Sequence, residues 1–143
     1  MDISINYLAV LVVVIFQMAF GVFWHGPLLG KIYAKLLGMD QLTAEQQQEI
    51  AKRMGPVYAT QIAITIITNI FLAYAIQHAG ALTVSEGICV ALILFVGFVA
   101  PTQIGGTIWS TQSNSDKFKK ILIDASFQLI VMTVAAVVFT LWK

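Results

Sequence analysis

The sequence predicts an all-α integral membrane protein, organised as a single transmembrane domain over residues 1–143 in which four helices form a bundle. Two observations predict this fold class. Of the 143 residues, 59% are hydrophobic and only 10% are charged, whereas a soluble domain carries about 25% charged residues. The apolar residues also gather in four runs of about 20 residues, which is the length that a helix needs to cross the hydrocarbon of a bilayer.

These runs give the predicted spans. Lipid offers the backbone no hydrogen-bond partners, so a chain crosses it as helices or as a closed barrel. The runs are continuous and lack the alternation of polar and apolar residues that marks barrel strands. The first run has no basic region before it and is longer than the apolar part of a signal peptide, so we expect it to be a retained span. The predicted spans are residues 5–24, 57–76, 88–109 and 121–142.

The basic residues predict the orientation. Seven of the eight lysines and arginines lie between the first and second spans or between the third and fourth, and the remaining one is Lys143. Because basic loops stay in the cytoplasm, we expect both of these loops inside and both termini outside, in the bacterial inner membrane. The seven inner residues are Lys31, Lys35, Lys52, Arg53, Lys117, Lys119 and Lys120.

The predicted cytoplasmic loop, residues 25–56, begins with a break in the first span. Proline lacks an N–H and disfavours helical geometry before it, so Gly26-Pro27 should end the first span and turn the chain along the membrane surface. Residues 28–37 carry apolar side chains at helical spacing with two lysines between them. This pattern predicts a short amphipathic helix in the headgroup layer, ended by Gly38.

The second part of this loop predicts a polar helix. Thr43, followed three residues later by Gln46, forms a capping-box pattern that starts a helix. That helix should run to about Met54, and Gly55-Pro56 should end it and start the second span.

Polar side chains inside the spans are the candidate functional residues, because each needs a partner within the protein. Two interpretations are open. These side chains can hydrogen-bond across helices and hold the bundle together, or they can line a polar cavity or ion path, which in so small a protein requires an oligomer or a groove. The residues concerned are Gln17, His25, Gln61, Thr65, Asn69, Gln103, Asp124 and Gln128.

The third span adds a row of small residues. Gly97, Pro101 and Gly105 recur every four residues and predict a face for close helix contact. Pro101 should also kink this helix. Cys89, in the same span, is expected to be a small packed hydrophobic residue.

Asp124 is the one acidic residue inside a predicted span. It lies four residues after Lys120, so the two side chains should pair on one helix face; a proton-relay role for Asp124 is the alternative. His25 should be an interfacial or helix-capping residue. The sequence contains no HExxH motif, no set of thiolates and no paired carboxylates, so it predicts no enzyme, no metal and no cofactor.

One motif resembles a known family. The stretch from Trp24 to Lys31, WHGPLLGK, is followed by Leu37-Gly38-Met39, and the chain closes with Leu141-Trp142. In these features the chain resembles the small bacterial membrane proteins of the domain of unknown function 1761 (DUF1761) family. The resemblance implies four spans and no established activity, and it provides no catalytic residues.

The function predicted from the sequence is non-enzymatic. With a net charge of +1 the chain has no basic field for nucleic acid; its surroundings are the lipid bilayer. We expect a scaffold or accessory subunit that forms a homo-oligomer, alone or with another membrane protein as its partner. The alternative is a small oligomeric channel or transporter for an ion or small solute.

Overall fold

The computed structural model describes residues 4–142, and within this part of the chain every regular element is helical. Four helical segments are long and apolar enough to cross a membrane: Tyr7–Leu28, Met54–His78, Val84–Ile108 and Asn114–Leu141. The predicted all-α, four-span fold is therefore confirmed. Lys143 and the first three residues of the predicted domain lie outside the described residues.

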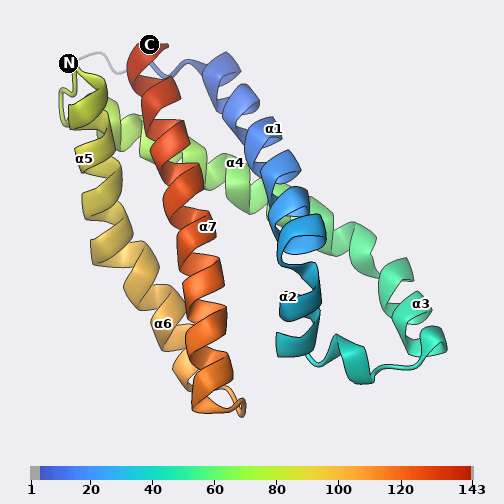
Figure 1. The fold of residues 1–143 in the computed structure, drawn as a ribbon. Helices are drawn as coiled ribbons and strands as arrows, with labels where there is room; N and C mark the ends of the chain where they lie inside the picture. Colours follow the sequence, from blue (N-terminus) through green and yellow to red (C-terminus); the bar gives the residue numbers. More distant parts are fainter. Residues whose placement is uncertain (1–3, 143) are drawn as a thin grey trace.

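The first span is not ended by its proline. Helix α1 (Tyr7–Phe23) leads into a π-helical turn, η1 (Trp24–Leu28), and the backbone leaves helical geometry only at Leu29. The N–H of Leu29 donates to the carbonyl of Trp24, five residues earlier, at 3.0 Å. The span was expected to end at Gly26-Pro27 and instead runs one residue past Pro27, because the wider π turn accommodates a residue without an N–H; the expected change of direction follows at Leu29. Helix α2 (Gly30–Leu36) then continues away from α1 with a bend (Figure 1).

The connection to the second span agrees with the sequence pattern. Gly38 adopts a left-handed conformation with φ of 70° and ends α2, and a short 3₁₀ turn, η2 (Met39–Gln41), follows. Helix α3 (Ala44–Lys52) starts with the expected capping box between Thr43 and Gln46. Helix α4 (Met54–His78) contains Gly55-Pro56 in its first turn, where a proline costs no hydrogen bond.

The second half of the chain is a pair of antiparallel spans. The third span is α5 (Val84–Leu94), a π-helical turn η3 (Phe95–Val99) and α6 (Ala100–Ile108). The predicted kink at Pro101 is thus realised as a π turn just before the proline. Helix α7 (Asn114–Leu141) is longer than the predicted span because its polar first turns extend the helix beyond the apolar run.

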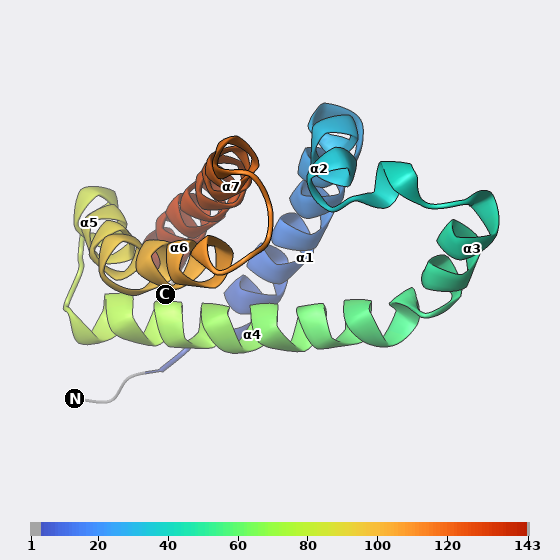
Figure 2. The same ribbon diagram turned by 90° about the horizontal axis from the view of Figure 1, so that it is seen from below.

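The largest cluster of buried residues lies toward the end of the bundle at which the described chain begins and ends. Helix α7 lies between α1 and the α5–α6 pair, while α4 crosses behind them (Figure 1). Figure 2, which shows the same ribbon from below, shows that α4 lies across the directions of the other spans along its whole length. Helix α3 lies far from α7 in this view. The core agrees with this arrangement, since its α4 members, Leu72, Ala73 and Ile76, come from the last turns of that helix. Residues 55–64 of α4 are exposed.

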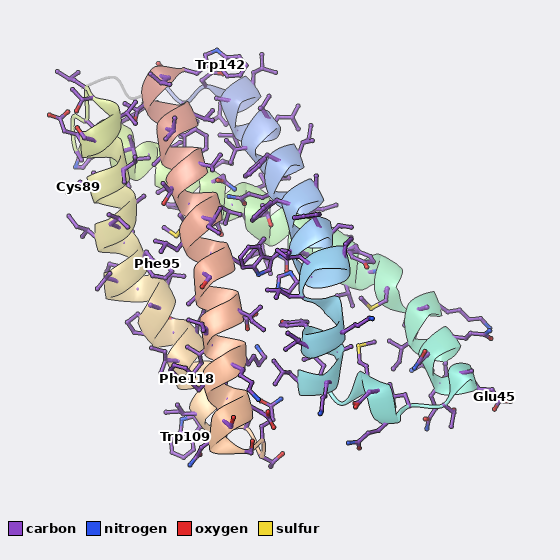
Figure 3. All side chains as sticks on the ribbon, viewed as in Figure 1. Glu45, Cys89, Phe95, Trp109, Phe118 and Trp142 are labelled. Atoms are coloured by element: carbon purple, nitrogen blue, oxygen red, sulfur yellow. The ribbon has the colours of Figure 1, made fainter. Side chains whose placement is uncertain are left out.

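For the third span, the expectation for Cys89 was wrong within the described chain, whereas the contact that Gly97, Pro101 and Gly105 would make with a second copy stays a prediction. Cys89 is exposed rather than packed, because it lies on the face of α5 that points away from α7 (Figure 3). A Cβ added at Gly97 or Gly105 would meet no atom within 4 Å, so this row of small residues contacts no other helix of the same chain. The close contact occurs instead at Gly87, where a Cβ would lie 2.1 Å from Oγ1 of Thr140 on α7.

Candidate ligand-binding cleft

The divergence of α4 opens a cleft of about 620 Å³ between α1, α4 and α7. It occupies the half of the bundle opposite the packed core. Most of the polar residues singled out from the sequence converge on it, although they come from all four spans. The predicted residues that line the cleft are Gln17, His25, Gln61, Thr65, Gln103, Asp124 and Gln128.

Asn69, the remaining member of the predicted set, closes the deep end beside Gln17. Its side chain is 0% exposed. Its Nδ2 donates to Oε1 of Gln17 at 2.9 Å and to the carbonyl of Thr65 at 2.8 Å, and Nε2 of Gln17 returns a bond of 3.4 Å to Oδ1. This pair of amides joins α1 to α4, so here the polar side chains serve helix packing.

The other amides of the cleft are not used in this way. Nε2 of Gln61 donates only to Thr65 on its own helix, at 3.3 Å. Oε1 of Gln103 is buried and has no hydrogen-bond partner within residues 4–142. Gln128 lines the cleft and its side chain makes no hydrogen bond in the described part of the chain. A buried acceptor without a partner costs free energy, so Oε1 of Gln103 in particular remains available to a molecule in the cleft.

A cluster of charged side chains forms the other end of the cleft. Oδ2 of Asp124 pairs with Lys120, as predicted, and Oδ1 lies 3.8 Å from Nε2 of His25. The side chains of His25 and Asp124 are 28% and 20% exposed. Nδ1 of His25 lies 3.2 Å from the carbonyl of Gly21. His25 therefore links the end of the first span to α7, which the sequence did not suggest.

Two aromatic residues that the sequence analysis missed complete this cluster. Tyr33 on α2 and Phe127 on α7 both meet the His25 ring edge to face, with centroid distances of 4.6 and 5.1 Å. Burial raises the pKa of Tyr33 to about 12, and the negative charge of Asp124 and its hydrogen bond with the phenol act in the same direction. The three-residue spacing from Asp124 to Phe127 indicated a shared helix face, but no pattern placed Tyr33 here.

Gly30 explains how Tyr33 reaches the cluster. A Cβ at this position would lie 2.9 Å from the carbonyl oxygen of His25, so only a glycine lets α2 start directly against the π turn. Helix α2 then holds Tyr33 beside His25. The π turn itself moves His25 and Gly26 to the cleft wall.

Comparison with known proteins places the chain in one family. Residues 8–140 match the family model described as "Protein of unknown function (DUF1761)". The chain belongs to the DUF1761 family. No curated protein and no solved structure matched it. A function for this DUF1761 protein is therefore inferred from the chemistry of its cleft.

The cleft of the DUF1761 protein offers hydrogen bonds rather than net charge. Lys120 neutralises Asp124, and the amide side chains provide both donors and acceptors. Apolar and aromatic side chains form the rest of its wall, among them Met18, Val22, Ile64, Phe127 and Val131. Within residues 4–142 there is no group of three His, Cys, Asp or Glu side chains that could hold a metal ion.

Proposed function

We propose that this DUF1761 protein is a non-enzymatic protein of the bacterial inner membrane that binds a small uncharged polar solute in its cleft and, as an oligomer, carries it across the membrane. The observation that supports this most is Oε1 of Gln103, which is buried and has no hydrogen-bond partner among the described residues. A side chain that only held helices together would have its partner inside the protein, as Gln17 and Asn69 do.

The charges support an uncharged ligand. The carboxylate of Asp124 already has Lys120 and His25 as neighbours, so it offers little to a cation, and it repels an anion. The amides of Gln61, Gln103 and Gln128 accept and donate equally well. Hydroxyl- or amide-bearing solutes fit this combination, with their apolar parts against Phe127 and Ile64.

The basic residues support a cytoplasmic entrance. Residues of α2 and α7 form the charged end of the cleft, and these two helices also carry Lys31, Lys35, Lys117 and Lys119. If these lysines face the cytoplasm, both termini and the packed core lie toward the outside.

A liposome experiment tests this proposal. Purified protein in liposomes is mixed with glycerol or acetamide, and the change in vesicle volume is followed by light scattering. Uptake should exceed that of empty liposomes. Gln103→Leu should reduce it by up to about tenfold, the value of one hydrogen bond. The matched control is Thr102→Val, because Thr102 is exposed and bonds only to the Phe98 carbonyl of its own helix.

Two outcomes would contradict the proposal. One is uptake of both solutes no faster than into empty liposomes. The other is equal uptake by the wild type and by Gln103→Leu, since that would mean that the unpartnered amide has no role in passage.

A second candidate is a scaffold or accessory subunit that self-associates, alone or with another membrane protein. It is supported by the third span, of whose most apolar window only 11% is buried inside the protomer. Its Gly97 and Gly105 face open space, which suits a helix of a second copy. Gly97→Leu with Gly105→Leu should then convert an oligomer to a monomer on sizing in mild detergent. A wild-type monomer would contradict the scaffold.

A further inference from the structure

Both ring nitrogens of His25 have neighbours that constrain where its protons lie. Nδ1 is 3.2 Å from the carbonyl oxygen of Gly21. A carbonyl oxygen only accepts hydrogen bonds, so Nδ1 must carry a proton for this bond to exist. A neutral imidazole has only one N–H. The neutral ring in this position therefore leaves Nε2 as a bare acceptor.

That second nitrogen faces a carboxylate. Nε2 lies 3.8 Å from Oδ1 of Asp124. In the neutral ring two lone pairs would face each other, and the contact would be repulsive. With a second proton, the ring becomes an imidazolium and the same contact becomes an ion pair between the π turn η1 and helix α7. The protonated ring can thus make an ion pair with Asp124 that this neutral tautomer cannot.

The surroundings leave room for one exchangeable proton. The groups that face His25 are Asp124 and Phe127 on α7, and Tyr33 on α2; Lys120 lies 5.9 Å from the centre of the Tyr33 ring. Lys120 occupies Oδ2 of Asp124, so Oδ1 remains for His25. The charges of Lys120, Asp124 and His25 sum to zero with a neutral ring and to +1 with an imidazolium, so a single proton changes the net charge of this end of the cleft.

We propose that His25 and Asp124 form a proton-binding site. A proton taken from water at the open end of the cleft binds to Nε2, and the resulting ion pair holds η1 against α7. Loss of that proton removes the ion pair and weakens the contact between η1 and α7. Both residues line the cleft, so occupancy of this site couples the pH on that side of the membrane to the width of the cleft. The inference goes beyond solute binding and does not depend on which solute the cleft takes.

Nitrogen NMR of the imidazole tests the proton positions. The described chain has a second histidine, His78, which stacks on Tyr74, so the experiment uses the full-length His78→Gln variant in lipid nanodiscs. At about pH 9 the His25 ring should be neutral with its proton on Nδ1, and at about pH 5 both nitrogens should be protonated. A neutral ring protonated on Nε2, or a single protonation state over this whole range, would overturn the proposal.

A double-mutant cycle tests the ion pair between His25 and Asp124. His25→Asn and Asp124→Asn, alone and together, are unfolded in a mixed-detergent titration at both pH values. At about pH 5 the pair should be coupled by about tenfold in the unfolding equilibrium constant, and at about pH 9 the coupling should disappear. His78→Gln, the matched control, should show no coupling to Asp124→Asn. A His25–Asp124 coupling equal at both pH values would overturn the proposal, even if solute uptake proved as expected.

Discussion

At the scale of single residues, Asn69 shows how one amide joins two helices inside a membrane. It is 0% exposed and exchanges hydrogen bonds with Gln17 across the α1–α4 contact. The alternative for either side chain is an unsatisfied amide in an apolar setting, which costs free energy.

We predict that Asn69→Leu destabilises the protein by about 1 kcal/mol, within the range measured for interhelical hydrogen bonds in membranes. The physical reason is the loss of both bonds to Gln17. Unfolding in mixed detergent measures the change. Thr68→Val is the matched control, because Thr68 bonds only to the Ile64 carbonyl of α4. The further loss of unfolding free energy when Gln17→Leu is added to Asn69→Leu should be smaller than the loss caused by Gln17→Leu in the wild type. If the two losses were equal, the two amides would be independent.

Tyr33 gives a pH prediction. Burial and Asp124 raise its pKa from an ordinary value of 10.0 to about 12. The fold therefore favours the protonated phenol, and the associated stability is present below pH 10.0 and is lost as the pH rises toward about 12. The ultraviolet absorbance of tyrosinate, taken as wild type minus Tyr33→Phe, should show this late transition. Asp124→Asn should move it to lower pH; an unchanged transition would mean that Asp124 does not act on Tyr33.

Residue patterns predicted part of the site. The spacing of Gln17 and His25, eight residues apart, and of Asp124 and Gln128, four apart, places each pair on one helix face, and each pair does line the cleft. Tyr33 was not foreseen because residues 28–37 were expected to lie on the membrane surface. The link from His25 to Asp124 depends on a π turn, and a backbone that shifts hydrogen bonding by one residue leaves no periodic trace in the sequence.

At the scale of elements, the contact between α5 and α7 depends on the absence of a side chain at Gly87. A Cβ there would lie 2.1 Å from Oγ1 of Thr140 and 3.3 Å from the carbonyl oxygen of Ala136. The same Oγ1 donates a hydrogen bond of 2.8 Å to that carbonyl. The two backbones approach closely at this point, as small residues permit in membrane bundles.

We predict that Gly87→Ala lowers the free energy of unfolding by about 1–3 kcal/mol, the usual cost of overpacking. Thermal or detergent unfolding of the purified protein measures it. Gly97→Ala is the matched control, since a Cβ there meets nothing within 4 Å and alanine improves helix propensity. If both substitutions had the same effect, the α5–α7 contact would not be as close as described.

The existence and type of the spans and of the two connecting helices followed from the sequence, because spans are long apolar runs and the capping box at Thr43 and the glycine at Gly38 are local signals. The contact faces did not follow. Gly97, Pro101 and Gly105 form a pattern of small residues typical of helix contact, yet they face away from the other helices of the chain. In a membrane the lipid-facing side of a helix is also apolar, so hydropathy does not indicate which face is packed.

At the scale of the whole molecule, the crossing of α4 decides the architecture. The main core lies toward the end at which the described chain begins and ends, and Trp109 and Trp142 lie at opposite ends of the molecule (Figure 3). Residues 55–64 of α4 are left exposed, and the cleft opens beside them. The closely packed four-helix bundle that the sequence predicts would have had no such space.

The central claim is that polar side chains of the spans line a water-filled cleft, and thiol labelling tests it most directly. In a Cys89→Ser background, a cysteine replaces Gln61, which lines the cleft, or its neighbour Ile62, which does not. A thiol reacts as the thiolate, which forms in water but not in hydrocarbon. With a charged methanethiosulfonate reagent, we predict that cysteine at 61 reacts at least about tenfold faster than cysteine at 62, and only from the cytoplasmic side. Equal, slow reaction at both positions would contradict the account.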